Sequence, residues 1–197
     1  TITNDDAQPT ITIGDASVAE GGSLVFTVTL SNASYQSVTV SYATADGSAT
    51  VADSDYGSAS GTLTFASGET TKTISVGSTG DTKLESDETL AVNLSSVLNA
   101  TIADGVAVGT ITNDDSAPSL SIGDASATEG GSLTFTVTLS AVSGLVTMVD
   151  WATADGSATT GDNDYTSGSG TLTFGAGETT KTVVIASSAD TKFEPDE

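Results

Sequence analysis

Apolar and polar side chains alternate over short stretches of this chain. Between residues 23 and 30 every second side chain is large and apolar, namely Leu24, Phe26, Val28 and Leu30. Side chains two residues apart point to the same face of a β-strand, so this period of two predicts a strand with one buried face. The same pattern returns at residues 133–139.

Six further stretches in the first part of the chain are short extended or alternating runs. Turn-forming Gly, Ser, Asp and Asn residues separate them, and no stretch between them repeats with the period of an amphipathic helix. The predicted strands cover residues 10–13, 24–30, 38–42, 63–65, 74–76, 90–94 and 106–111. Short strands joined by turns, without helices, predict an all-β Greek-key sandwich.

An aromatic side chain occupies the inward face of the third predicted strand. It is Tyr42 in the first part of the chain and Trp151 at the matching place further on. An aromatic buried between two sheets is typical of immunoglobulin-like sandwiches, although the cysteine pair that accompanies it in antibodies is absent. The predicted fold class is therefore an immunoglobulin-like Greek-key β-sandwich.

The chain repeats itself with an offset of 109 residues and without gaps. The matching segments are residues 1–6 with 110–115, 43–50 with 152–159, and 61–65 with 170–174. A unit of about a hundred residues has the size of one sandwich domain. We therefore expect residues 1–6 to be the tail strand of a preceding repeat, residues 7–115 to be a complete domain, and residues 116–197 to be a second domain truncated before its last two strands.

The second domain would then lack counterparts of residues 89–115. Open sheet edges recruit other strands, so we expect residues 116–197 to be loose or to pair with another chain by strand addition. Residues 1–6 of a neighbouring molecule could act as a partial substitute for the last strand. We also expect the parent protein to be a longer array of like modules, with neighbouring repeats as partners.

Composition excludes several classes of function. The chain has no Cys and no His, which removes disulfides, thiolate or imidazole metal sites and the usual general base. Four basic against 26 acidic residues give a net charge of −22, which repels nucleic acid and anionic membranes. No apolar run has the length of a transmembrane helix, and the N-terminus shows no signal peptide. Cations and basic surfaces remain as partners.

The most concentrated chemistry lies in residues 81–88, where four carboxylates occur within eight residues between two predicted strands. The loop returns as residues 190–197. Carboxylates gathered this closely repel one another by about 3 kcal/mol per pair at 5 Å, and a divalent ion reverses the sign of that energy. Calcium accepts six to eight hard oxygen ligands in flexible geometry, whereas magnesium demands a strict octahedron, so calcium is the predicted ion. A merely acidic surface is the alternative.

The whole repeat resembles the Calx-β domain, an immunoglobulin-like calcium-binding module of sodium/calcium exchangers, integrin β4 and many bacterial surface proteins. The resemblance rests on motifs in the family's order, at residues 20–22, 44–49, 53–56, 61–65, 68–72, 81–88 and 111–115. Together these motifs are specific, whereas any one alone is weak.

The resemblance implies a calcium site at one end of each sandwich. In the first repeat the implied side-chain ligands are Glu20, Asp55, Asp81, Glu85, Glu88, Asp114 and Asp115, with Lys83 offering its backbone carbonyl. In the second repeat they are Glu129, Asp164, Asp190, Glu194 and Glu197. Gly80 and Asn113 stand where stronger calcium-binding members carry acids, which implies fewer ions here.

The function expected from these observations is a calcium-binding structural or adhesive module of a secreted or cell-surface bacterial protein. Calcium would stiffen the end of the domain and the linker to the next. One alternative is an adhesion domain that binds a glycan or a surface protein, and another is a regulatory calcium sensor. An enzyme is not expected, because the carboxylates lie in a short charged loop without the aromatic-lined cleft of a glycosidase.

Overall fold

The computed structural model describes residues 1, 3, 5–192 and 196, which form two compact units. The first unit contains residues 1–81 and 86–114, and the second contains residues 82–85 and 115–197. Every regular element of the described residues is a β-strand, which confirms the all-β prediction. The described part of the chain contains no helix with the length and apolar character that crossing a bilayer requires.

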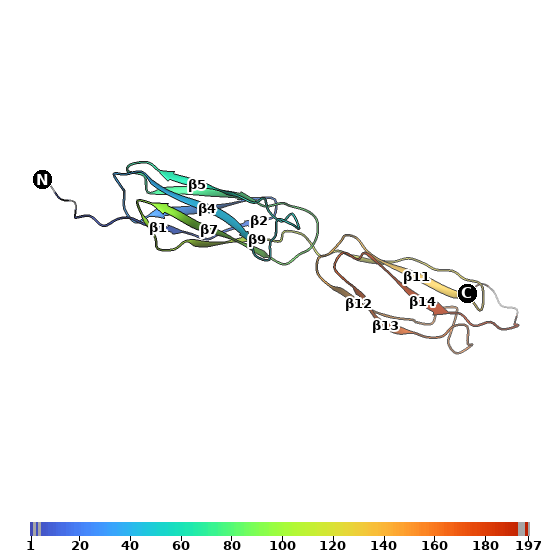
Figure 1. Ribbon diagram of the computed structural model, residues 1–197. Helices are drawn as coiled ribbons and strands as arrows, with labels where there is room; N and C mark the ends of the chain where they lie inside the picture. The colour runs from blue at the N-terminus through green and yellow to red at the C-terminus, as the bar shows by residue number, and fades with distance from the viewer. Residues whose placement is uncertain (2, 4, 193–195, 197) are drawn as a thin grey trace. The chain divides into compact units, whose positions relative to one another are not determined.

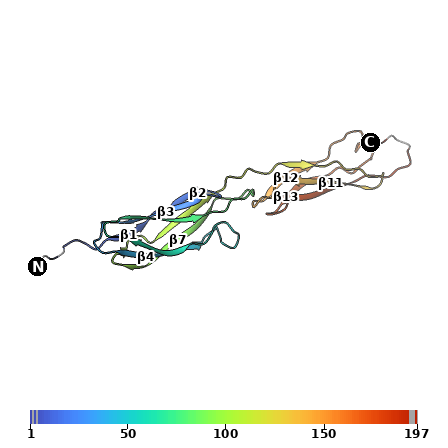
Figure 2. The ribbon, with the colours of Figure 1, turned by 90° about the horizontal axis from the view of Figure 1, so that it is seen from above.

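The first unit is a sandwich of two sheets. One sheet has the strand order β6-β3-β1-β8 and the other β2-β9-β7-β4-β5. The strands are β1 (Thr10–Ile13), β2 (Ala16–Ala19), β3 (Ser23–Leu30), β4 (Val38–Asp46), β5 (Ser60–Phe65), β6 (Thr71–Gly77), β7 (Glu88–Leu98), β8 (Thr101–Ile102) and β9 (Val106–Thr112). Strands β4, β5 and β7 lie side by side in Figure 1, and the turned view in Figure 2 shows β1 and β3 on the opposite side.

The alternating pattern of residues 23–30 produces the core as predicted. Leu24, Phe26 and Val28 are fully buried, whereas Val25 between them is 53% exposed. Buried residues of β4 and β7 face them from the other sheet, and Tyr42 packs against this core from its edge. The inward position predicted for Tyr42 is therefore confirmed.

Two strands of the first unit were not predicted. The chain leaves the first sheet at Gly14 and Asp15, and β2 then pairs in parallel with β9 in the second sheet. Strand β8 pairs in parallel with β1 through two residue pairs. Both strands are short and lack a strong alternation, so their pairing depends on partners that are distant in sequence rather than on their own pattern.

The second unit repeats part of the strand pattern of the first unit. Its strands are β10 (Leu120–Ile122), β11 (Ser132–Leu139), β12 (Thr147–Ala152), β13 (Ser169–Phe174) and β14 (Thr180–Ala186). One sheet has the order β10-β11-β14, and the other consists of β12 and β13. Figure 1 labels β11 and β14 of the first of these sheets and both strands of the second. Trp151 packs against the smaller core of this unit, which agrees with its predicted inward position.

A hydrogen-bonded loop at residues 46–56 connects β4 to β5 and is repeated at residues 155–165. The Tyr56 hydroxyl donates a hydrogen bond of 2.6 Å to Asp46 Oδ1, and the side chain of Tyr56 is 3% exposed. Burial, followed by this hydrogen bond, raises the pKa of Tyr56 above its ordinary value. In the second unit Tyr165 donates the equivalent bond of 2.7 Å to Asp155 Oδ1.

The Tyr56 contact predicts a loss of stability in alkaline solution. Since the folded pKa is raised, the stabilisation is complete below the unfolded pKa of about 10 and is lost as the pH rises through the folded pKa. Replacing Tyr56→Phe removes the hydrogen bond at a cost of about 1 kcal/mol near neutral pH, and it also removes this part of the alkaline loss. Calorimetry between about pH 8 and 11 measures both effects.

Tyr165→Phe is the matched control, because the same change in the second unit moves the transition of that unit and leaves the first one in place. The explanation is wrong if the Tyr56→Phe protein keeps the full alkaline loss in its first transition.

Candidate metal site

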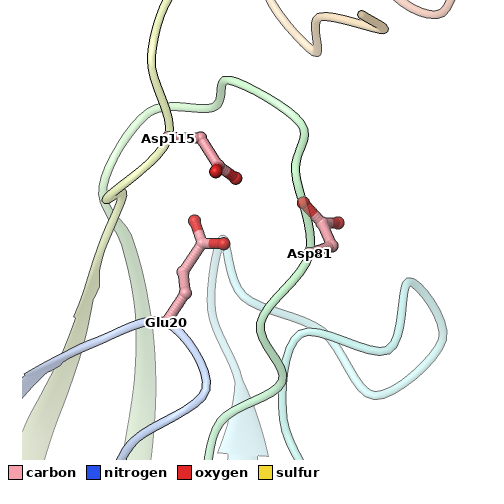
Figure 3. A group of neighbouring side chains, drawn as sticks. All are labelled: Glu20, Asp81 and Asp115. Carbon is pink, nitrogen blue, oxygen red and sulfur yellow. The ribbon is translucent and has the colours of Figure 1, made fainter.

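Three of the predicted carboxylates come together at one end of the first sandwich. One carboxylate oxygen from each of Glu20, Asp81 and Asp115 lies within 4.8 Å of the other two, and Figure 3 shows the three side chains pointing toward a common centre. Glu20 directly follows β2, Asp81 lies in the loop after β6, and Asp115 follows β9. The three residues are far apart in sequence, so the sandwich alone brings them together.

Two glycines bring Glu20 next to Asp81. Gly21 has a positive φ of 71°, a conformation that glycine adopts without strain, and Gly80 packs against it. A Cβ on Gly80 would lie 3.2 Å from the Cα of Gly21, so the facing loop would have to shift by a few tenths of an ångström to admit a side chain there. The glycine at residue 80 therefore has a packing role beside the cluster.

The segment that carries Asp115 is held by hydrogen bonds on both sides. The backbone N–H of Glu20 donates to the Thr112 carbonyl at 3.1 Å. The backbone N–H of Asn113 donates to Asp87 Oδ1, also at 3.1 Å. These bonds hold the chain two and three residues before Asp115, whose Oδ2 atom is buried. Asp87 was not among the predicted site residues. Its partner is 26 residues away, so local sequence gives no signal that separates it from its neighbours.

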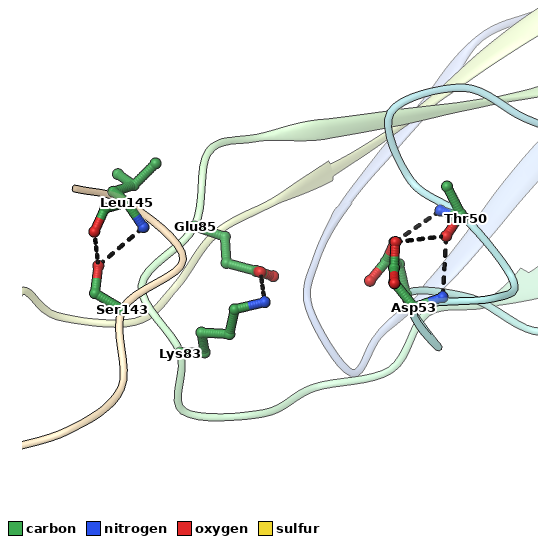
Figure 4. A network of polar contacts seen from close by, with 7 residues as sticks. Thr50, Asp53, Lys83, Glu85, Ser143 and Leu145 are labelled. Atoms are coloured by element: carbon green, nitrogen blue, oxygen red, sulfur yellow. Dashed lines mark hydrogen bonds and ion pairs between the residues drawn. The ribbon is translucent and has the colours of Figure 1, made fainter. Parts of the chain in front are cut away.

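Asp55 lies near the cluster through its backbone but is not part of it. The carbonyl of Asp55 accepts a hydrogen bond of 2.9 Å from the N–H of Thr79, two residues before Asp81. Asp55 Oδ2 accepts a bond of 2.7 Å from the N–H of Thr50. Asp53 reinforces the same loop by accepting a bond from the Thr50 hydroxyl, as Figure 4 shows. The Oδ2 atom of Asp55 therefore stabilises the loop at residues 50–55 through this hydrogen bond.

The acidic loop after Asp81 continues into the second unit. Residues 82–85 belong to that unit, where the Leu84 carbonyl accepts a hydrogen bond of 2.9 Å from the N–H of Gly144. The ammonium group of Lys83 forms an ion pair with Glu85, and both side chains appear in Figure 4. The side chain of Lys83 thus neutralises one of the predicted ligands.

The remaining predicted ligands of the first repeat are placed outside the cluster. Glu88 is half-buried as the first residue of β7, and Asp114 is exposed beside Asp115. Neither side chain is grouped with Glu20, Asp81 and Asp115. Their assignment as ligands, like those of Asp55, Lys83 and Glu85, stays a prediction.

In the second unit two of the predicted ligands, Glu129 and Asp190, are in contact. The backbone N–H of Asp190 donates to Glu129 Oε1 at 2.8 Å, and Lys192 lies 3.5 Å from Asp190 Oδ2. Asp164 Oδ2 accepts a bond of 2.7 Å from the N–H of Thr159, as Asp55 does in the first unit. The predicted ligands Glu194 and Glu197 lie outside the described residues. Over residues 5–192 no second group of three converging carboxylates is found.

The donor set of the first cluster consists of carboxylate oxygens alone. Hard oxygen donors suit Ca²⁺ or Mg²⁺, whereas zinc and copper sites usually include His or Cys. The three carboxylates lie on three separate loops, which follow β2, β6 and β9. Separate loops can adjust their spacing, so the number of ligands and their distances from an ion are not fixed by one rigid element. The cluster is therefore chemically suited to a hard divalent cation with tolerant coordination.

Comparison with solved structures shows the same fold. The crystal structure of CBD12 from CALX1.2 is 23% identical over 93% of this chain and 76% of its own length, with a TM-score of 0.51. The calcium binding domain CBD12 of CALX1.1 is also 23% identical, over 88% of this chain and 74% of its own, with a TM-score of 0.51. An apo-form Calx CBD1 domain is 20% identical and matches 55% of this chain over its full length, with a TM-score of 0.51.

No curated protein matches the sequence. The Calx-beta domain model matches the chain twice, over residues 4–116 and again over residues 114–197. The first match contains all three carboxylates of the cluster, and together the two matches extend over nearly the whole sequence. The chain therefore belongs to the Calx-beta family, as a tandem of two such domains.

Proposed function

We propose that the first domain binds calcium at the cluster of Glu20, Asp81 and Asp115. The convergence of these three carboxylates is the observation that carries the proposal. A solved structure with the same fold is described as a calcium binding domain. Three like charges this close oppose the folded arrangement, and a divalent cation turns that repulsion into attraction.

Calcium fits this cluster better than magnesium does. Calcium accepts six to eight oxygen ligands, so three side chains leave room for further carboxylates, carbonyls and water. Asp55, Glu88 and Asp114 lie in the segments that adjoin the cluster and are the first candidates for these places. Magnesium retains its own water and requires a stricter octahedron, which loops of different origin are less suited to provide.

The role that we propose for the bound ion is mechanical. Asp115 follows the last strand of the first domain, and Asp81 directly precedes residues 82–85, which group with the second unit. An ion held by both residues would fix the two chain segments that leave the first domain. The protein would then be a structural module of a secreted or cell-surface protein, with no catalytic role, in which calcium stiffens successive domains.

An adhesion domain that grips a glycan would present exposed aromatic rings. Among the described residues, the large exposed hydrophobic side chains include one aromatic, Tyr35, which is 94% exposed. A single ring does not form the stacking surface that a glycan site uses. This observation favours the structural role over direct glycan binding.

Calcium titration tests the proposed site. We expect heat of binding in isothermal calorimetry, and a tenfold excess of calcium over Kd adds about 1.4 kcal/mol to the stability of the first unit. Asp81→Asn or Asp115→Asn removes one charged ligand and weakens binding at least about tenfold, or about 1.4 kcal/mol. The proposal fails if the unaltered protein binds no calcium at millimolar concentration.

Three further variants sharpen the calcium titration. Glu69→Gln removes a carboxylate that pairs with Lys72 at 2.9 Å, outside the cluster, and leaves calcium affinity unchanged. Asp87→Ala weakens calcium binding because Asp87 holds the segment that carries Asp115. Its matched control is Asp15→Ala, since Asp15 also accepts a backbone N–H, from Val108, but not beside the cluster. An equal loss of calcium affinity in Asp87→Ala and Asp15→Ala would mean that Asp87 acts only through the overall stability of the domain.

Small-angle scattering of the two-domain chain tests the mechanical role. We expect a narrower range of interdomain distances with calcium than with a chelator, because the ion fixes both segments that leave the first domain. Asp115→Asn should remove this difference while the domains remain folded. Identical scattering with calcium and with chelator, in a protein that binds calcium by calorimetry, would contradict the mechanical role and leave the binding site intact.

A further inference from the structure

The dipeptide Asp-Gly occurs three times in the chain, and each copy follows an alanine. The three copies are Asp46-Gly47, Asp104-Gly105 and Asp155-Gly156. In this dipeptide the backbone nitrogen of glycine can attack the side-chain carboxyl of aspartate, because glycine has no Cβ that hinders the approach. Since the local sequence is nearly the same in all three copies, a large difference in their reactivity has to come from the folded structure.

In the first copy, hydrogen bonds hold both of the groups that would react. Asp46 Oδ1 accepts one bond of 2.6 Å from the Tyr56 hydroxyl and another of 3.2 Å from the N–H of Val51. The N–H of Gly47, which carries the attacking nitrogen, donates to the Ala49 carbonyl at 3.1 Å. These bonds have to break before the nitrogen can reach the carboxyl, so the fold protects Asp46.

The copy in the second unit is held in the same way. Asp155 Oδ1 accepts bonds of 2.7 Å from the Tyr165 hydroxyl and 3.0 Å from the N–H of Thr160. The N–H of Gly156 donates to the Ala158 carbonyl at 3.0 Å. The hydrogen bond from Tyr165 holds the pKa of Asp155 below its ordinary value, which reduces the fraction of carboxylic acid. Only the acid form can release its hydroxyl as water, so Asp155 is protected as well.

The copy between β8 and β9 lacks this protection. Asp104 is exposed, and its Oδ1 atom accepts one long bond, of 3.3 Å, from the N–H of Val106. Over the residues that the structure describes, no hydrogen bond is found for the N–H of Gly105 or for the carbonyl of Asp104. The bond from Val106 turns the carboxyl toward the C-terminal side of Asp104, where the nitrogen of Gly105 also lies.

The chain is anchored on either side of this unbonded peptide group. The N–H of Asp104 donates to the Ile11 carbonyl at 3.2 Å. The carbonyl of Gly105 accepts a bond of 2.7 Å from the N–H of Leu94. These bonds fix the flanking groups, whereas the peptide group between Asp104 and Gly105 is left to rotate. Reaction at Asp104 therefore needs a local rotation and no unfolding of β8 or β9.

We propose that Asp104 is a site of spontaneous covalent modification, where the chain closes to a succinimide and reopens as isoaspartate. The nitrogen of Gly105 loses its proton and forms a bond to Cγ of Asp104, while the bond from Cγ to the hydroxyl breaks and water leaves. Water then adds to either ring carbonyl and one C–N bond breaks. The products are aspartate or isoaspartate, and the reaction consumes no oxidant, reductant or cofactor.

Isoaspartate at residue 104 changes the main chain at the start of β9. It lengthens the backbone by one methylene group beside the bond that joins Gly105 to Leu94. The register of β9 against β7 begins at the next residue, where Val106 pairs with Asn93. We therefore expect the isomerised protein to unfold at a lower temperature in its first unit, by a few degrees, and to keep the transition of its second unit.

Incubation of the full 197-residue chain in heavy-oxygen water at mildly acidic pH tests the site. Each reopening of a ring takes one heavy oxygen atom from the solvent, and mass spectrometry of peptides locates it. We expect the label to accumulate at Asp104 at least about tenfold faster than at Asp46 or Asp155, whose carboxyls each have two hydrogen bonds to break. A protease that cuts before aspartate but not before isoaspartate then measures the isomerised fraction.

Two variants and a denatured sample are the controls. Asp104→Glu keeps the charge but requires a larger ring that closes far more slowly, so it should lose the label at residue 104. Tyr56→Phe removes one hydrogen bond from Asp46 and should raise labelling there severalfold, with Asp104 unchanged. In denaturant the three aspartates should be labelled at similar rates, because the hydrogen bonds that distinguish them are gone.

Several results would overturn the proposal. Equal labelling of the three aspartates in the folded chain would mean that the hydrogen bonds do not decide reactivity. Label at residue 104 that persists in the Asp104→Glu variant would enter by exchange of carboxyl oxygens and not through a ring. Label at Asp104 without isoaspartate would exclude ring opening, which yields both products. Faster labelling of Asp104 in denaturant as well would assign the difference to local sequence and not to the fold.

Discussion

The pairing of β7 with β4 and β9 is the interaction on which the first domain depends. It places β7 in the interior of the five-stranded sheet and buries Leu90 and Val92 against the opposite sheet. The same strand pair begins beside Asp87 and ends just before Asp115. Closing the core and assembling the carboxylate cluster are therefore one structural event. The described residues of the second unit include no such strand pair. There the core is partly open, and no equivalent cluster is found among those residues.

Charge in this protein is concentrated in the loops. The four lysines each pair with a nearby carboxylate of their own loop or turn, and these exposed pairs contribute little to stability. Most of the 26 acidic residues thus have no ammonium group to offset them. A bound divalent cation is the simplest source of the missing positive charge at the end of the sandwich. Stability of the domain and calcium concentration would then be linked.

Sequence reasoning succeeded for the fold because its signals are local. Alternation at residues 23–30 predicted the buried face of β3, and the offset of 109 residues predicted the matching strands of the second unit. It missed β2 and β8, which are strands only because of distant partners. For the site, Glu20, Asp81 and Asp115 were among the predicted ligands. Asp87 was left out of the predicted ligands, and the structure shows it accepting a hydrogen bond from the N–H of Asn113 on another segment.

The sequence by itself determined the strand pattern, the tandem repeat, the all-oxygen donor chemistry and the family, because each of these depends only on residue type and on spacing along the chain. The tertiary structure decided which carboxylates face one another. Gly80 illustrates the division: in the sequence it is a missing acid, and in the structure it packs against Gly21 between the loops of Glu20 and Asp81. Distances between side chains depend on strands that pair across the sandwich, and local spacing carries no information about that pairing.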